Sequence, residues 1–340
     1  MISLQNTFVN ILLFLIILQI ILLLIQLILG IYKYFIIDEL NLLERYGKES
    51  WVIITGASSG QGYDFAISFA KRNFNILMIG SKRCLGTQNF INTHYPNVKT
   101  KMIIKDFRKA FEDDFFNDIE KEINNIGVNN ALLINNVGYR VGWKPYHKMN
   151  PNYIRDTIAT GTIVQSRMTH MLIPFFIERN NIGVKSGLIN ITAQCMHPNF
   201  LLGITCSNEI SLPYLSVYEA SNAFGFYQGN SIYKEYEGIF DILNITPGAI
   251  ITNNTKYLSG TLFNIESKVF VDNIISFLGN IQGTTCGYWG HALSNYLINF
   301  APFIKDYMLH NVGEIIANNF MQDAINNTMH NGIQNNKYDL

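Results

Sequence analysis

Residues 51–62 decide the fold, and they read Trp51-Val-Ile-Ile-Thr-Gly-Ala-Ser-Ser-Gly-Gln-Gly62. The stretch begins with an apolar run that has no polar alternation, which is typical of a strand buried on both faces of a parallel sheet. It ends in a glycine-rich turn, and a segment of helical period follows directly. Glycines permit a tight turn and close approach of the backbone to a pyrophosphate, while the N-terminus of the next helix offers unpaired N–H groups. Glycine-rich turns also close strands that bind nothing, but the position between strand and helix favours a dinucleotide phosphate site made by Gly56, Ser58, Ser59, Gly60 and Gly62.

Strand and helix signals alternate along the rest of the chain. Short apolar runs predict strands at residues 52–55, 76–80, 102–105, 131–135, 187–191 and 240–246. Apolar residues at spacings of three and four predict crossover helices between them, at residues 64–73, 151–179 and 214–236. This order predicts an α/β fold with a doubly wound parallel sheet of the Rossmann type.

An apolar segment precedes the predicted sheet. No charged side chain stands before Lys33, and residues 8–29 are nearly all apolar. As a helix they span roughly 33 Å, enough to cross a hydrocarbon core. A basic start and a small-residue cleavage site are missing from this segment, which favours an uncleaved transmembrane anchor. Basic residues follow the span and none precedes it, so the domain is expected in the cytosol. The predicted division is an anchor at residues 1–32, a juxtamembrane linker at 33–50, the α/β domain at 51–315 and a C-terminal tail at 316–340.

Composition excludes some partners. Lys and Arg together number 25, as do Asp and Glu, so no positive excess is available to hold nucleic acid. The 4 cysteines show no paired spacing, which favours reduced thiols over a disulfide or metal framework. No metal site is therefore predicted. Asn-x-Ser/Thr sequons begin at Asn190, Asn244, Asn253 and Asn326, and we interpret them as chance matches in an Asn-rich chain.

Two motifs at a consistent spacing make the sequence similar to one known family. Residues 55–62, TGASSGQG, resemble the TGxxxGxG motif of short-chain dehydrogenases, and residues 135–138, NNVG, resemble that family's NNAG. The NNVG variant, Pro174 and the run at residues 287–293 resemble one branch, the microsomal 3-ketoacyl-CoA reductases and 17β-hydroxysteroid dehydrogenases. The resemblance covers about residues 40–315. It implies a location in the endoplasmic reticulum membrane and an acyl-CoA or steroid-like substrate.

The same resemblance implies further cofactor contacts. Asp106 would hydrogen-bond the adenine, although a solvated carboxylate at a strand end is an open alternative. Asn135 would lie near the adenosine ribose, in the motif that ends at Gly138. The contacts with the nicotinamide end would come from Pro247, Gly248 and Thr252.

Cofactor choice depends on the end of the second predicted strand. Many relatives that use NADPH carry Arg there, whereas this chain has Gly80. Lys82 and Arg83 follow at once, so a cation for a 2′-phosphate is available. No acidic residue stands there to favour an unphosphorylated ribose. NADP(H) is therefore favoured over NAD(H).

The catalytic residues that the resemblance implies are mostly replaced. The family uses Tyr as the acid, a Lys that tunes it, a Ser that binds the carbonyl and an Asn that holds a relay water. Here the tyrosine is Tyr218, while Asn222, Ala193 and Gly161 stand at the other three positions. Asn222 can still hydrogen-bond a ribose, but it carries no charge. Thr192 is a hydroxyl one residue too early, and alternation along a strand should direct it away from the site.

Between Ala193 and Tyr218 the chain is longer than in the family, and residues 194–213 are interpreted as a surface loop with an insertion beside the substrate pocket. A polar side chain from this loop could return to the site. Cys195 and His197 lack the further ligands that a metal site needs.

The sequence favours two functions over a third, a purely structural membrane protein with an empty cofactor site, which gives no reason for the complete glycine turn. The first is an NADP(H)-dependent reductase of 3-ketoacyl-CoA or a steroid-like ketone, with Tyr218 as the acid. The second is a catalytically impaired pseudoenzyme that binds nucleotide or lipid and acts through partners, such as fatty-acid elongation enzymes. The replaced positions favour the second, and the complete glycine turn favours cofactor binding in either case. The membrane lipid bilayer is an expected partner of both.

Overall fold

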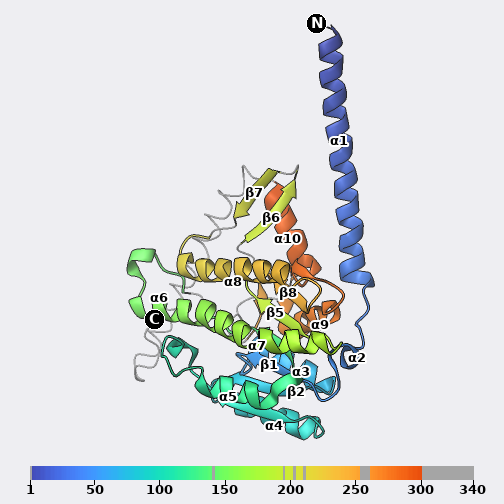
Figure 1. Ribbon diagram of the computed structural model, residues 1–340. Coiled ribbons are helices and arrows are strands. Elements are labelled where there is room, and N and C mark those ends of the chain that lie inside the picture. The colour runs from blue at the N-terminus through green and yellow to red at the C-terminus, as the bar shows by residue number, and fades with distance from the viewer. Residues whose placement is uncertain are drawn as a thin grey trace.

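A seven-stranded parallel sheet forms the centre of the molecule (Figure 1). The computed structural model describes residues 2–139, 142–193, 196–201, 204–209, 212–252 and 261–300. The strand order is β11-β8-β5-β4-β1-β2-β3, and every neighbouring pair is parallel. The strands are β1 Trp51–Thr55, β2 Asn75–Gly80, β3 Thr100–Ile104, β4 Asn130–Asn135, β5 Gly187–Ile191, β8 Asp241–Ile245 and β11 Gly283–Thr285.

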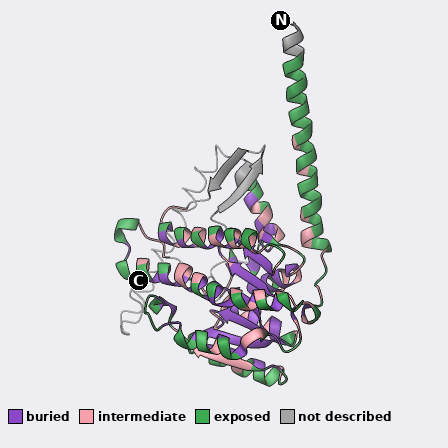
Figure 2. Ribbon diagram, viewed as in Figure 1, coloured by how far each residue is buried: buried purple, intermediate pink, exposed green. Residues whose placement is uncertain are grey.

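Helices cover both faces of this sheet, so most strands are buried (Figure 2). One core lies between the sheet and α2, α3, α4 and α9, and the other lies between the sheet and α5, α7 and α8. Val52 and Ile54 enter the first core while Trp51 and Ile53 enter the second, as expected where side chains alternate along a strand. The helices are α2 Leu42–Tyr46, α3 Gly60–Lys71, α4 Cys84–His94, α5 Asn117–Ile126, α6 Pro151–Ile158, α7 Val164–Asn181, α8 Ser216–Glu235, α9 Ser267–Phe277 and α10 Trp289–Phe300.

The strand order places the site. The chain runs from β1 outward to β2 and β3, then crosses back to place β4 on the other side of β1. The order of the strands therefore reverses between β1 and β4. In a doubly wound sheet, ligands bind beyond the carboxyl ends of the strands at this point.

The predicted doubly wound parallel sheet is confirmed, and the six predicted strands all form within two residues of the expected positions. The helix expected at residues 64–73 begins earlier, at Gly60. The helix expected at residues 151–179 consists of α6, a π-helical segment η5 (Ala159–Ile163) and α7. β11 and the short pair β9 (Ile250–Ile251) and β10 (Ile265–Glu266) were not predicted.

The segment expected as a surface loop contains a hairpin. β6 (Met196–Leu201) and β7 (Ile204–Glu209) pair as antiparallel strands, so residues 194–213, expected as a surface loop with an insertion, include a hairpin that was not predicted. Neither Cys195 nor the side chain of His197 belongs to the described part of the structure. The two strands pair backbone N–H and C=O groups across an antiparallel ladder. The order of apolar and polar residues in this segment did not predict that pairing.

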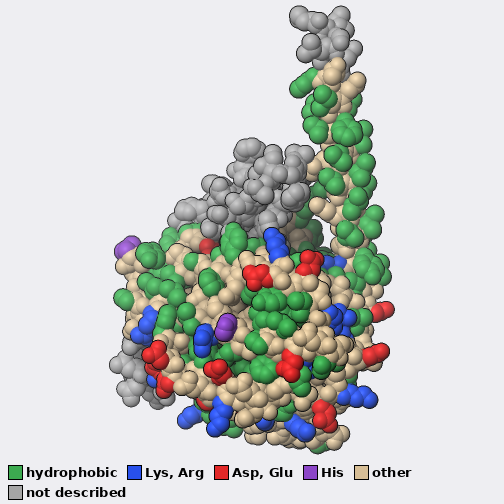
Figure 3. All heavy atoms as spheres, viewed as in Figure 1, with side chains coloured by type: hydrophobic (Ala, Val, Ile, Leu, Met, Phe, Trp, Pro, Cys, Tyr) green, Lys and Arg blue, Asp and Glu red, His purple; other side chains and the backbone are tan. Residues whose placement is uncertain are grey.

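The N-terminal segment is a continuous helix, α1 (Ile2–Ile31), followed by a π-helical turn, η1 (Tyr32–Ile36). By length and composition alone, residues Thr7–Ile36 could cross a membrane, and an 18-residue window within them has a mean hydropathy of 3.2. Exposed hydrophobic side chains follow α1 from Phe8 to Ile31 (Figure 3).

The segment expected as a linker, residues 33–50, is folded onto the sheet. Within it, α2 places the Tyr46 hydroxyl 2.6 Å from the Asp241 carboxylate and the Arg45 guanidinium on the same carboxylate at 2.6 and 2.8 Å. Tyr46 and Asp241 are buried. Buried charge is stabilising only when it is paired in this way. The domain is thus attached to α1 through ordered structure.

Candidate functional site

The glycine-rich turn after β1 has the shape that the sequence predicts. Gly56 and Gly60 have φ angles of +73° and +55°, a region that side chains disfavour. A Cβ on Gly62 would lie 2.2 Å from the Gly56 carbonyl oxygen, so only glycine fits there. Ser59 precedes α3 in an extended conformation and its side chain makes no capping hydrogen bond. The first N–H groups of α3 are therefore not capped by this serine and can bind an anion.

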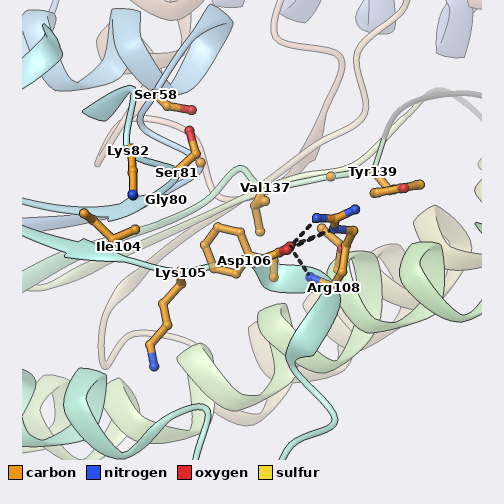
Figure 4. A pocket seen from close by; sticks show the side chains of 14 residues that line it. Ser58, Gly80, Ser81, Lys82, Ile104, Lys105, Asp106, Arg108, Val137 and Tyr139 are labelled. Carbon is orange, nitrogen blue, oxygen red and sulfur yellow. Dashed lines mark hydrogen bonds and ion pairs between the residues drawn. The ribbon is translucent and has the colours of Figure 1, made fainter. Parts of the chain in front are cut away.

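A cleft of about 440 Å³ opens beside this turn, at the point where the strand order reverses (Figure 4). It is lined by five parts of the chain. The turn supplies Gly56 and Ser58, the end of β2 supplies Gly80 to Lys82, and the segments after β3 and β4 supply the rest of the polar lining together with Thr160 of η5. Of the predicted cofactor residues, the cleft lining brings together Gly56, Ser58, Lys82, Asp106 and Gly138.

The Asp106 carboxylate is held by a neighbour on the floor of the cleft. Arg108 donates to it through Nε at 2.9 Å and through a terminal nitrogen at 2.6 Å (Figure 4). This hydrogen-bonded guanidinium lowers the pKa of Asp106 below its ordinary value. The carboxylate is thus ionised and oriented at neutral pH. Its predicted contact with adenine stays a prediction, and Arg108 is a lining residue that sequence reasoning missed.

The cations around the cleft are not equivalent. Lys105 extends away from Ser58 and Ser81 (Figure 4) and pairs with Asp118 at 2.6 Å. Lys82 lines the cleft beside Ser81, and no ion pair joins it to any carboxylate in the described part of the chain. Lys82 is therefore the cation that can reach an anionic ligand at the end of β2.

Thr160 was not predicted, and it brings an unsatisfied hydroxyl to the cleft. Its side chain is 3% exposed, and Oγ1 has no hydrogen-bond partner among the described residues. Thr157 and Thr162, in the same helical run, each donate to the carbonyl four residues earlier, at 2.7 and 2.6 Å. A buried polar group without a partner is destabilising. An orphaned hydroxyl in the wall of a cleft is a fitting contact for a polar ligand.

Asn135 is buried and held by neighbouring polar side chains. Its amide is 4% exposed and donates to Thr169 Oγ1 and Asn190 Oδ1, both at 2.9 Å. Asn190 in turn donates to Asn244 at 2.9 Å. These in-register amides form a buried row across β4, β5 and β8, beneath α7 and α8. Asn135 is outside the cleft lining, so its ribose contact remains only a prediction. The sequons at Asn190 and Asn244 are buried in the folded domain.

Tyr218 lies in the first turn of α8 and is half-buried. Four residues on, the Asn222 amide donates to the Tyr218 carbonyl oxygen at 2.9 Å, so it is bonded within its own helix. Ser221 is buried and donates to the same carbonyl at 2.8 Å. A Cβ on Gly161 would lie 2.9 Å from Ser221 Oγ. Ser221 therefore fills the space beside the position where the family carries its relay asparagine.

The remaining predicted residues lie at the carboxyl ends of β5 and β8. The Thr192 hydroxyl donates to the Ile245 carbonyl oxygen at 3.0 Å, in agreement with the expectation that it does not face the site. Ala193 follows it and is half-buried. Pro247 and Gly248 follow β8, and the Thr252 side chain lies 3.5 Å from the position of a Cβ on Gly60. The loop after β8 therefore reaches the glycine-rich turn.

Titratable side chains elsewhere do not assemble a metal centre: across the described ranges, no three His, Cys, Asp or Glu residues lie close enough to hold an ion. Cys84 and Cys286 are buried free thiols. Burial raises the pKa of each thiol to about 11. Both are thus protonated near neutral pH and unsuited to nucleophilic chemistry.

Comparisons with known proteins agree with this geometry. The family model for short chain dehydrogenases matches residues 50–196. Hydroxysteroid dehydrogenase-like protein 1 of Gallus gallus is 27% identical over 267 residues, which are 76% of this chain and 73% of that protein. The very-long-chain 3-oxoacyl-CoA reductase of Homo sapiens is 26% identical over 262 residues, 75% of this chain and 77% of that protein.

Solved structures share the fold. A short-chain dehydrogenase from Sphingobium yanoikuyae in complex with NADPH superposes with a TM-score of 0.56 at 18% identity, over 69% of this chain and 87% of that one. A 3-ketoacyl-(acyl-carrier-protein) reductase from Brucella melitensis complexed with NADH gives a TM-score of 0.56 at 15% identity, over 70% of this chain and 95% of that one.

Proposed function

Since this chain is an oxidoreductase of the short-chain dehydrogenase family that resembles 3-oxoacyl-CoA reductases, we propose that it is a membrane-anchored, NADP(H)-dependent reductase of a 3-oxoacyl-CoA or a steroid-like ketone. The observation that carries the proposal is the cleft itself. A turn that accepts only glycine at Gly62, a helix N-terminus and the orphaned Thr160 hydroxyl meet at the point where the strand order reverses. These are the groups that a dinucleotide needs.

The residues around the cleft fit a phosphorylated cofactor. Lys82 stands at the end of β2, and the Asp106 carboxylate is already neutralised by Arg108. A 2′-phosphate at this end would therefore meet Lys82 without an unpaired carboxylate close by. This supports NADP(H) over NAD(H), and solved relatives of the same fold have been found with either cofactor.

The proposed carbonyl reduction depends on Tyr218 as the proton donor. A bound nicotinamide supplies the hydride, and the carbonyl oxygen then needs a proton. Tyr218 at the start of α8 would donate that proton, since a tyrosine hydroxyl is a donor at neutral pH. Asn222 brings no charge and is bonded within its own helix. The oxyanion therefore develops with less electrostatic stabilisation than a lysine would give, and turnover should be slow.

The names of the relatives and the N-terminal helix support the setting. The relatives from Homo sapiens and Rattus norvegicus are named very-long-chain 3-oxoacyl-CoA reductases, and their substrate class suits an enzyme held at a lipid surface. We place α1 across the endoplasmic reticulum membrane, with the domain on the cytosolic side because basic residues follow the span.

A second function is favoured by the replaced positions. Gly161, Ala193 and Asn222 together leave Tyr218 as the one family catalytic residue, so the protein could hold nucleotide without turnover and act through fatty-acid elongation enzymes. The reductase is preferred because the related proteins are named for that activity and because the cleft retains its full phosphate turn.

The test is turnover by the full-length protein in lipid nanodiscs, with NADPH and a long-chain 3-oxoacyl-CoA. NADPH consumption should be measurable but slower than a typical rate of about 10 s⁻¹. Tyr218→Phe should lower it by roughly 10² or more, because a positioned acid is lost. Tyr227→Phe is the matched control, since Tyr227 is an exposed tyrosine of the same helix, and it should leave the rate unchanged.

Two results would go against the reductase. NADPH binding without any turnover would favour the nucleotide-binding alternative. Turnover that survives Tyr218→Phe would mean that another group supplies the proton.

A further inference from the structure

The end of the candidate membrane span is fixed to the domain by specific contacts. The Tyr34 hydroxyl lies 3.3 Å from the Thr285 hydroxyl, and its ring packs edge-on against Phe277 with centroids 5.7 Å apart. The Phe35 ring lies 6.0 Å from that of Trp289, the first residue of α10. Both Tyr34 and Phe35 belong to the span Thr7–Ile36. The span therefore ends against α9 and α10, which sets where α10 begins relative to a membrane.

α10 has an unusual distribution of side chains for a helix on the surface of a soluble domain. Its outward residues Leu293, Tyr296 and Leu297 are 36%, 41% and 52% exposed, at the spacing of one helix face. Its inward residues His291 and Asn295 are polar and buried. The sequence of α10 contains no charged residue. A surface helix normally shows the reverse pattern, so the outward face fits an apolar environment.

Further exposed apolar side chains continue this face. Phe35 and Ile36, at the end of the span, are 65% and 58% exposed, and Leu262 is 48% exposed. The Leu262 carbonyl oxygen lies 2.3 Å from the position of a Cβ on Gly290, so this residue contacts the first turn of α10. We call the surface made by Phe35, Ile36, Leu262, Leu293, Tyr296 and Leu297 the juxtamembrane patch.

α10 and the end of the span, which carry most of the patch, lie on the side of the domain from which α1 leaves (Figure 1). Figure 1 shows α1, α10 and the β6–β7 hairpin extending from the same side of the sheet. α10 is about 18 Å long at 1.5 Å per residue, comparable to one leaflet of a bilayer.

We propose that the juxtamembrane patch is immersed in the leaflet from which α1 emerges, so that the domain lies against the bilayer in one fixed orientation. The proposal rests on the membrane anchoring proposed above. A lipid surface is the partner that fits, because the patch is continuous with the span, carries no charge and includes a tyrosine, a residue suited to the membrane interface. A ketone with a long acyl chain could then reach the domain from the lipid phase.

The test is photo-crosslinking of the full-length protein in phosphatidylcholine nanodiscs that contain an alkyne-labelled phosphatidylcholine. The photoreactive amino acid p-benzoylphenylalanine replaces Leu297 in the patch, Leu18 in the middle of α1, or Leu85 in α4. Leu85 is the matched control, because it is 47% exposed and α4 lies at the end of the molecule opposite α1 (Figure 1). The lipid label at position 297 should exceed that at position 85 by about 10-fold, as expected for immersion of one surface only.

The three labelled positions test the immersion of the juxtamembrane patch separately from the membrane anchoring of α1. Labelling at positions 18 and 297 but not 85 supports it. Labelling at position 18 alone overturns it while the anchor stands. Absence of label at position 18 refutes the anchor, and the immersion of the patch falls with it. A product with twice the mass of the chain at position 297, without lipid label, overturns it in favour of a contact between two copies.

Discussion

The unsatisfied hydroxyl of Thr160 gives a prediction in which two effects have opposite signs. Thr160→Val keeps the shape of the side chain and removes the hydroxyl. Because Oγ1 is buried without a partner, its removal should stabilise the cofactor-free protein by about 1 kcal/mol or more, out of the 1–3 kcal/mol that an unsatisfied buried group costs. For a chain of this size, that raises the melting temperature by roughly 2 °C or more.

The same change should weaken cofactor binding. If the Thr160 hydroxyl bonds the cofactor, its loss removes about 1 kcal/mol of binding free energy, which is about a 5-fold rise in the Kd of NADPH. The assays are thermal melting in detergent without cofactor and NADPH titration followed by fluorescence. If the Thr160 hydroxyl serves the ligand and not the fold, Thr160→Val should raise the melting temperature and also raise the Kd of NADPH.

Thr157→Val is the matched control. Thr157 lies in the same helical run and is 1% exposed, but its hydroxyl donates to the Tyr153 carbonyl oxygen at 2.7 Å. Removing it should lower the melting temperature and leave the Kd of NADPH unchanged. If Thr160→Val lowers the melting temperature as the control does, the hydroxyl is satisfied in the free protein. If it leaves the Kd unchanged, Thr160 does not contact the cofactor.

Three further predictions follow. Gly62→Ala should remove NADPH binding, because its Cβ would lie 2.2 Å from a carbonyl oxygen of the turn. Gly86→Ala is the control and should leave binding intact, because no atom lies within 4 Å of the added Cβ. Equal NADPH binding by the two variants would contradict the phosphate site. Arg179 is 3% exposed and donates to carbonyl oxygens of three separate segments, so Arg179→Met should destabilise the protein by about 3 kcal/mol in a melting experiment. Arg167 is exposed on the same helix and lies 5.3 Å over the Phe116 ring, so Arg167→Met should cost no more than about 1 kcal/mol. Burial raises the pKa of Glu219 from 4.5 to about 7, so the folded state is destabilised as the pH rises through this window. Glu219→Gln should therefore raise the free energy of unfolding by about 1 to 2 kcal/mol at pH 8, after allowance for solvent screening, and by little at pH 4.5. An equal gain at both pH values would exclude this cause.

The fold could be predicted from the sequence wherever burial alone determines the pattern. The runs that became β1, β2 and β4 are apolar without alternation because both faces of a parallel strand are covered. β11 is short and consists of glycine and threonine, so no hydrophobic period marks it. α3 begins at Gly60, before its apolar pattern does, because glycine has low helix propensity and carries no side chain that could show a period. Tertiary contacts determine both β11 and the start of α3, and such contacts cannot be predicted from local composition.

The site divides in the same way. The glycine turn could be predicted because close approach of backbone to backbone allows no other residue at Gly62. Tyr218 could be placed by resemblance alone, and its setting depends on the packing of α8 against η5. Thr160 gave no sequence signal. Its hydroxyl lacks a partner among the described residues, although a threonine in a helix usually bonds the preceding turn and Thr162 of the same π-helical segment does so. The Arg108 contact with Asp106 likewise spans two residues of an irregular turn that no periodicity describes.

The replaced catalytic positions are packed as parts of an intact fold. Gly161 leaves the space that Ser221 enters, and the Ser221 hydroxyl is bonded to the Tyr218 carbonyl oxygen. The Asn222 amide is bonded to the same oxygen, and the Thr192 hydroxyl is bonded across the sheet. The polar donors beside these positions are therefore satisfied, whereas the hydroxyl of Thr160, a residue that lines the cleft, has no partner among the described residues. Replacing that hydroxyl with a methyl group should stabilise the cofactor-free domain. A loss of NADPH affinity in the same variant would then assign the hydroxyl to the ligand and not to the fold.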